Sequence, residues 1–220
     1  MATETAPISI QRIGTETIRI PIVGTAPLIV HRFSEKAKRQ MLDAMQGRKN
    51  PKQPKDPQAE YDSCFYRCDD GTYGFPALAF KAATVGAARF FGKDVTMTSL
   101  RQVLFMDAEL SKTDGQRLVR INGIAELVDT QAEPVMREDV VRVGIGGTDL
   151  RYRPQFTEWS CVVDVIFVSS MLTRESVLSL VEAGGLGVGV GEWRPERKGD
   201  FGTYKIDPSR SVEVLTAANT

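Results

Sequence analysis

The chain begins with apolar and polar positions that alternate before a kink. Residues 16–30, ETIRIPIVGTAPLIV, alternate and then run apolar, with Gly24 and Pro27 between the two parts. Alternation with a period of two is typical of a strand, so this segment predicts a strand, a kink and a short buried strand. Ser34 is a typical N-cap, and apolar residues at helical spacing up to Gly47 predict a helix of about three turns.

Three further patterns follow this helix. Residues 47–58, with three prolines and several basic residues, predict an exposed loop instead of a packed element. Asp-Asp-Gly at 69–71, between CFYRC and TYGF, predicts a hairpin. Pro76 begins a predicted alanine-rich helix that runs to about Phe91. The face expected to pack on a sheet consists of Leu78, Ala82, Val85, Ala88 and Arg89.

The second half of the chain is richer in β-branched residues, which favour strands. The predicted elements are strands at 117–128, 140–145 and 160–170, a helix at 173–183 and a strand at 201–206. Thr173 is the expected N-cap of the helix, and Gly184 and Gly185 are expected to end it.

The main elements therefore follow the order β-α-β-β-α-β, which is typical of a ferredoxin-like (RRM-like) fold. They are 16–30, 76–91, 117–128, 160–170, 173–183 and 201–206. We predict an α+β fold with this core, in which residues 1–220 form a single domain. The segments outside the core are an exposed basic loop at 47–58, an inserted hairpin or finger at 130–155 and a frayed tail at 207–220.

Basic residues are concentrated locally, although the 28 Lys and Arg residues balance the 28 Asp and Glu residues. Residues 32–55 carry an excess of six positive charges, which would attract phosphates through screened Coulomb forces and counterion release. Residues 137–153 combine arginines with Tyr152, a mixture that suits gripping phosphates and stacking on bases. The alternatives are an ordinary solvated helix and loop for the first segment, and a polar hairpin with its own salt bridges for the second.

Residues 184–202, GGLGVGVGEWRPERKGDFG, are unusually rich in glycine. Glycine permits close approach of a backbone or a ligand and leaves N–H groups accessible to phosphate. The segment is not a dinucleotide fingerprint, because its glycines follow a helix instead of preceding one. Tight packing against a neighbouring helix is the alternative, while Trp193 and Arg194 favour a ligand surface.

Few residues are suited to catalysis or metal binding. His31 is the only histidine, and no serine lies in a G-x-S-x-G turn. His31 either packs its ring in the fold, contacts a phosphate or base, or acts as a general base. Cys64, Cys68 and Cys161 are too few for a disulfide framework or a structural zinc site. We therefore expect no catalytic residue, no metal and no cofactor.

No segment predicts an association with membranes. The chain has no apolar run of the roughly 18 residues that a membrane span requires, and its first residues lack the order of a signal peptide. We expect a cytoplasmic protein that does not bind membranes.

Three segments together resemble the RAMP superfamily, the CRISPR effector subunits that line a guide RNA. GFPALAFKAATVGAAR (74–89) is similar to that family's proline-led, lysine-bearing helix, although it lacks the family's Gly-Ser-Ser. Pro76, Lys81, Gly86 and Arg89 keep the general plan. Residues 184–191 resemble the RAMP glycine-rich loop, and R-E-D-V-V-R-V with the later E-W resembles the arm before the third core strand. The resemblance covers about a third of the chain and implies RNA binding on a ferredoxin-like core.

A second resemblance concerns the origin of the chain. PLIVHRFSEKAK and GVGVGEWRPE look like an uncharacterised family of tailed phages, which implies a phage-encoded RAMP-like protein in a bacterial cytoplasm.

These patterns predict a non-catalytic protein that binds single-stranded RNA or DNA and self-assembles along it as a homo-oligomer or filament. RNA coating within a RAMP-like assembly and strand coating in phage recombination both remain open. The alternatives are a phage structural or assembly protein that makes only protein–protein contacts and, with less support, an endoribonuclease that uses His31. The predicted nucleic-acid-binding residues are His31, Arg32, Lys36, Lys38, Arg39, Arg142, Arg151, Tyr152, Arg153, Trp193 and Arg194, with Lys81, Arg89, Gly187, Gly189 and Gly191 implied by the RAMP resemblance.

Overall fold

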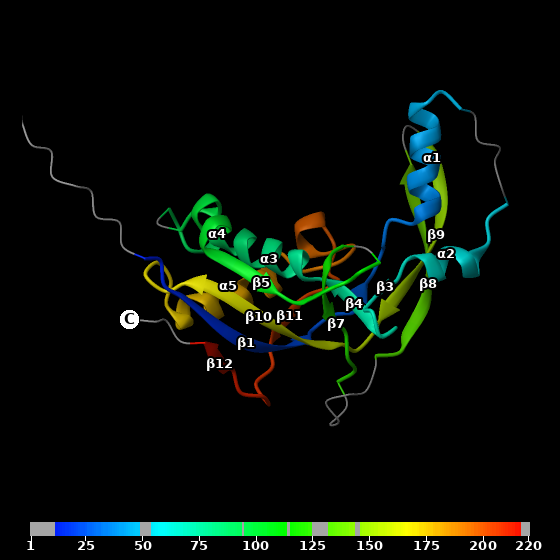
Figure 1. The fold of residues 1–220 in the computed structure, drawn as a ribbon. Coiled ribbons are helices and arrows are strands. Elements are labelled where there is room, and N and C mark those ends of the chain that lie inside the picture. Colours follow the sequence, from blue (N-terminus) through cyan, green and yellow to red (C-terminus); the bar gives the residue numbers. More distant parts are fainter. Residues whose placement is uncertain are drawn as a thin grey trace, which may run out of the picture.

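A central antiparallel sheet runs through the molecule (Figure 1). The computed structural model describes residues 12–48, 54–93, 95–113, 115–124, 132–143 and 146–216. The sheet has the order β11–β1–β10–β5, and β12 pairs with β1 on the same edge as β11. Its strands are β1 (Thr15–Gly24), β5 (Leu104–Asp107), β10 (Ser160–Val168), β11 (Tyr204–Ile206) and β12 (Glu213–Thr216).

Helices α3 (Ala77–Gly86) and α5 (Arg174–Gly187) pack side by side on one face of this sheet. The elements β1, α3, β5, β10, α5 and β11 of the sheet and its two helices follow one another in this order along the chain, with other elements between them. One assignment was wrong, because β5 takes the place predicted for 117–128. The four residues 104–107 are too short a strand to stand out in the sequence pattern.

Residues from the predicted strand at 117–128 belong to a different sheet, with the order β3–β4–β7–β6. Its strands are β3 (Tyr66–Arg67), β4 (Tyr73–Pro76), β6 (Glu109–Leu110) and β7 (Arg117–Arg120). Residues 125–128 lie outside the described part. The predicted Asp-Asp-Gly hairpin is confirmed, since β3 and β4 pair across a turn in which Gly71 has a φ of 86°.

A long hairpin and one helix project from the rest of the molecule (Figure 1). Strands β8 (Pro134–Val143) and β9 (Gly147–Phe156) pair along their full length, within and just beyond the segment predicted to be an inserted finger. The short strand β2 (Leu28–Ile29) pairs with the base of β9. Helix α1 (Glu35–Met45) begins at the predicted N-cap Ser34, and none of its residues is buried.

Helix α2 (Pro57–Ser63) covers the free edge of β9. Glu60 accepts a hydrogen bond from the Tyr152 N–H (3.4 Å), and the Cys64 thiol donates to the Tyr152 carbonyl (3.6 Å). Of the loop predicted at 47–58, residues 49–53 lie outside the described residues, 54–56 are exposed, and Pro57 already begins α2.

The main core lies between the central sheet and its helices. Ile18, Ile20 and Ile22 of β1 are buried, with exposed Arg19 between the first two and buried Pro21 between the last two, and alternate positions of β10 are buried as well. Trp159 and Tyr204 complete this core. It positions α3, α5 and the segment that follows α5, which borders the site described below.

One predicted packing face and two predicted element boundaries need correction. In α3 the buried face includes Phe80 and Ala83, whereas Leu78 is 72% exposed, so the predicted packing face was wrong in part. Helix α5 continues to Gly187 instead of ending at Gly184. Residues 213–216, predicted to lie in a frayed tail, form β12, because their backbone pairs with the edge of β1.

The remaining helical elements are α4 (Met97–Val103), η1 (Ala87–Phe90) and η2 (Pro195–Arg197). None of the helices in the described part of the chain is long and apolar enough to cross a lipid bilayer.

Candidate nucleic-acid interface

A wide groove separates α1 from α2 and the hairpin; we call it the outer groove. Basic and acidic side chains from all three elements line it. The basic residues are His31, Arg32, Lys36, Arg48, Lys55 and Arg151, and the acidic ones are Glu35, Asp56, Glu60 and Asp149. Because the positive and negative side chains of the groove are nearly balanced, an anionic ligand can be attracted only by the cations that are not already paired with a carboxylate.

Lys55 is held by acidic neighbours, at 2.7 Å from Asp149 and 3.5 Å from Glu60. By contrast, Lys36 on α1 and Arg151 on β9 have no acidic partner within ion-pair distance in the described part of the chain. These two cations therefore remain available to an anionic ligand.

Other cations of the same stretch are engaged or not described. Arg48 lies 3.6 Å from Asp43, and Arg32 lies 3.7 Å from Glu35. Lys49 and Lys52, which contribute to the charge excess of residues 32–55, lie outside the described residues.

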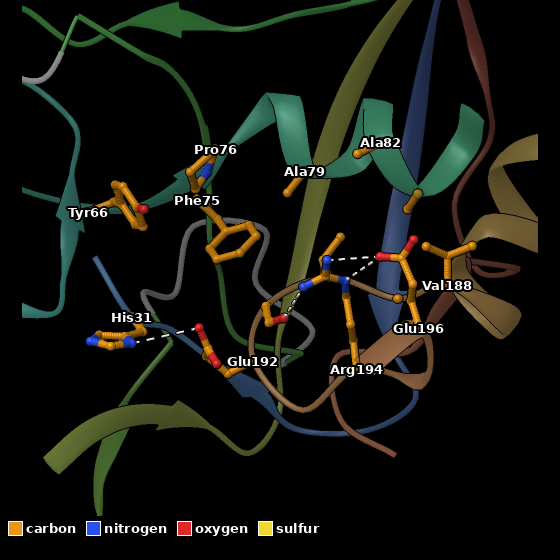
Figure 2. A pocket seen from close by; sticks show the side chains of 14 residues that line it. His31, Tyr66, Phe75, Pro76, Ala79, Ala82, Val188, Glu192, Arg194 and Glu196 are labelled. Atoms are coloured by element: carbon orange, nitrogen blue, oxygen red, sulfur yellow. Dashed lines mark hydrogen bonds and ion pairs between the residues drawn. The ribbon is translucent and has the colours of Figure 1, made fainter. Parts of the chain in front are cut away.

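A second, smaller hollow lies between α3 and residues 188–196 (Figure 2); we call it the inner pocket. Its volume is about 220 Å³. Small and apolar groups form much of its wall, and a few polar groups converge on it. The lining residues used below are Tyr66, Phe75, Ala79, Val188, Glu192 and Arg194.

His31 lines both the outer groove and the inner pocket, so the two hollows meet at its side chain. Its Nδ1 atom lies 3.7 Å from the Glu192 carboxylate (Figure 2). The interaction with His31 lowers the pKa of Glu192, and burial opposes this effect in part. Glu192 is thus a carboxylate at neutral pH, and sequence reasoning missed it because its position depends on residues distant in the chain.

Arg194 lies on one side of the inner pocket and hydrogen-bonds to residues of its own loop. It donates to the Gly191 carbonyl (3.0 Å) and, through two nitrogens, to Glu196 (2.9 and 3.2 Å). These bonds fix the guanidinium at the wall of the pocket (Figure 2).

Arg153 was expected to contact nucleic acid, and the structure contradicts this expectation. Its side chain is 1% exposed and donates to Asp139 at 2.6 Å, with Glu192 at 3.5 Å. Asp139 also accepts from Arg137. Arg153 therefore joins the hairpin to the segment around Glu192 and has no surface to offer a ligand.

The alternation of strand β9 separates the other predicted residues of the finger. Arg151 and Arg153 lie on one face, and Tyr152 lies on the opposite face, where it interacts with Glu138. Arg142 on β8 is exposed. Its cross-strand neighbour is Thr148, which places Arg142 on the same face as Tyr152. These side chains are close to one another along the chain, but the alternation of the strands places them on opposite faces of the hairpin.

The glycines of 184–191 serve close packing, which was the alternative interpretation of this segment. A Cβ atom on Gly185 would lie 2.2 Å from the Tyr204 carbonyl oxygen, and one on Gly187 would lie 2.3 Å from the Phe90 ring. Gly189 has a φ of 70°, and its N–H already donates to the Gly184 carbonyl. Gly189 and Gly191 nevertheless line the inner pocket, so part of the predicted loop does border the site.

The remaining predicted residues lie outside the two hollows. Lys81 donates to the Arg101 carbonyl and lies over the Phe105 ring, and Arg89 donates to the Gly86 carbonyl. Lys38 pairs with Glu35 at 2.6 Å. Arg39 and Trp193 are exposed, and Trp193 has a left-handed backbone with a φ of 54°.

The three cysteines are buried and lack the character of reactive thiols. Burial raises the pKa of Cys64 to about 11 and raises that of Cys161 as well. Within the described residues, no three His, Cys, Asp or Glu side chains are grouped in a way that could hold a metal ion.

The fold and the site define a protein with mixed helices and antiparallel sheets and an open groove that leads into a small pocket. No model of a known protein family matches the chain, and the search of curated proteins finds no relative. Among solved structures, the crystal structure of Cmr6 from Pyrococcus furiosus is similar over 89% of this chain and 100% of that chain, with 11% identity and a TM-score of 0.45. The resemblance to a tailed-phage family stays a prediction.

Proposed function

We propose that this chain is a non-catalytic protein that binds a single strand of RNA or DNA in the outer groove. The observation that supports this most is that Lys36 and Arg151, on separate elements of one groove, have no acidic ion-pair partner among the residues that the structure describes. At the inner end of the groove, His31 opens onto a pocket with aromatic residues in its wall.

The physical argument starts from the repeating negative charge of a strand. Cations on α1 and β9 can contact successive phosphates, and each contact releases condensed counterions. Arg151 offers a planar fork of donors to a phosphate, whereas Lys36 acts as a compact point charge. The groove takes RNA and DNA strands alike, because contacts of this kind involve the phosphates that both share.

The proposal includes a ferredoxin-like core of the RAMP type. If β1, β5, β10 and β11 are taken as the four core strands in chain order, their spatial order β11–β1–β10–β5 is 4-1-3-2. This order supports the proposal, as does the position of α3 and α5 on one face of the sheet. In this proposal the hairpin β8–β9 and α1 are additions to the core that supply the groove.

The lack of a catalytic role is likewise a proposal. His31 is the chain's only histidine, and the ion-pair partner of its ring within the described residues is the Glu192 carboxylate. Incubation with a labelled RNA strand tests this point. We expect intact RNA, and cleavage that is lost in His31→Ala would establish the endoribonuclease instead.

We further propose that several copies assemble along one strand. The apolar side of α1 supports this, because Met41, Leu42 and Met45 are each at least half exposed on a helix without buried residues. Light scattering with and without a long oligonucleotide tests it. Growth that depends on the strand supports the proposal, and a closed oligomer without any strand supports a structural or assembly protein.

The decisive experiment is a charge reversal in the groove. We expect the double variant Lys36→Glu, Arg151→Glu to bind a fluorescent 20-nucleotide strand at least tenfold more weakly than wild type, since two attractive contacts become repulsive. Lys205→Glu, an exposed residue on β11 away from the groove, is the matched control. Equal affinity of the double variant and the control would refute binding in this groove.

A further inference from the structure

We propose that the inner pocket accepts one unstacked guanine base of the bound strand and that Glu192 recognises it. This inference rests on the proposed function and adds base selectivity to it. It follows from the size of the pocket, the chemistry of its wall and its position beside the groove.

The pocket has the size and the surface for a single flat base. Its volume of about 220 Å³ is below the roughly 300–1,000 Å³ that is usual for pockets of drug-sized ligands. Ala79 and Val188 present small apolar surfaces, and the Phe75 and Tyr66 rings stand on one side (Figure 2). Unpaired bases are commonly recognised between aromatic and apolar side chains of this kind.

Glu192 supplies acceptors that are not yet saturated. Its oxygens lie 3.7 Å from His31 and 3.5 Å from Arg153, both longer than a good hydrogen bond, and its side chain is 43% exposed. An ionised carboxylate only accepts hydrogen bonds and has room for about four. The two present contacts therefore hold Glu192 in place and leave lone pairs for a ligand.

Guanine matches this carboxylate better than the other bases do. Its ring N1–H and its amino group form two adjacent donors on one edge, so both carboxylate oxygens can accept at once. Adenine and cytosine place an acceptor nitrogen beside their amino group, which would face a carboxylate oxygen unfavourably. Uracil offers one N–H between two carbonyl oxygens.

Arg194 and His31 complete the recognition. Arg194 uses three of its five N–H donors within its own loop, so donors remain for the guanine O6 atom. His31 marks the passage between the groove and the pocket. A strand whose phosphates contact Lys36 and Arg151 can thus turn one base past His31 into the pocket.

The test compares 20-nucleotide RNA strands of uridine alone, of uridine with one central guanosine, and of uridine with one central adenosine. We expect wild type to bind the guanosine strand about tenfold more tightly than the other two, as for one bidentate base contact. In Glu192→Gln this ratio should fall to about one, because the amide replaces one acceptor with a donor.

A second variant tests the pocket without altering Glu192. Ala79→Leu fills the pocket and should also bring the ratio to about one, whereas Leu78→Ala, exposed on the same helix, should keep it. Equal binding of all three strands by wild type, or a preference for adenosine, overturns this inference and leaves strand binding intact. If no strand binds, the proposed function itself fails.

Discussion

Arg153 and Asp139 form an ion pair of 2.6 Å between the two strands of the hairpin, although the Arg153 side chain is 1% exposed and that of Asp139 is 10% exposed. Arg153 also lies 3.5 Å from Glu192. The pair thus joins the hairpin, which borders the outer groove, to the segment that borders the inner pocket. Its loss should affect the stability of the fold more than any single charge on the surface.

Arg153→Ala should lower the free energy of unfolding by about 1.5–3 kcal/mol, since it removes a short charge-assisted hydrogen bond from a nearly buried carboxylate, which then keeps its bond to Arg137. Urea denaturation followed by fluorescence measures this change. Arg142→Ala on the exposed face of the same hairpin is the control, with an expected change within about 0.5 kcal/mol. Equal stability of the two variants would mean that Arg153 does not hold the hairpin in place.

The glycines at the end of α5 allow a second prediction. Gly185→Ala would bring a Cβ atom to 2.2 Å from the Tyr204 carbonyl oxygen, so backbone must shift, at a cost of about 1–3 kcal/mol or more. Thermal unfolding should show a clear decrease in Tm. Leu186→Ala, 75% exposed at the next position, should change Tm little. A Gly185→Ala protein as stable as wild type would show that close packing does not require a glycine at this position.

The Cys64 thiol makes stability depend on pH in the alkaline range. Burial raises its pKa to about 11 from an ordinary value of 9.0. Above pH 9 the unfolded chain therefore loses this proton while the folded chain keeps it, and the free energy of unfolding falls as pH rises from about 9 towards 11.

Urea midpoints at pH 8 and pH 10.5 measure this effect. The decrease should be smaller in Cys64→Ala than in wild type, because all other groups titrate alike in the two proteins. An identical decrease in both would show that the Cys64 thiol does not titrate differently in the folded and unfolded states.

Local patterns predicted several elements well. The cap at Ser34, the cap at Thr173 and the turn at Gly71 depend on neighbours within a few residues, and each is present. The assignment of 117–128 to the central sheet failed because Leu118 and Val119 look like any buried strand residues, and only tertiary contacts decide which sheet they join.

The site was predicted less completely than the fold. His31, Arg32, Lys36 and Arg151 were predicted and line the outer groove, because exposed basic residues stand out in a sequence. Glu192 was missed, since a carboxylate acquires its role here only through contacts with His31 and Arg153. Arg153 was misjudged because the sequence does not reveal which arginine of a hairpin is buried.

The salt dependence of strand affinity tests the central claim most directly. If Lys36 and Arg151 each neutralise one phosphate, a plot of log affinity against log salt should have a slope of about −1.4, at about −0.7 per phosphate of a single strand. The slope should be close to zero in the Lys36→Glu, Arg151→Glu variant and unchanged in Lys205→Glu. An affinity of wild type that does not change with salt, or the same slope in all three proteins, would contradict the binding of a strand in the outer groove.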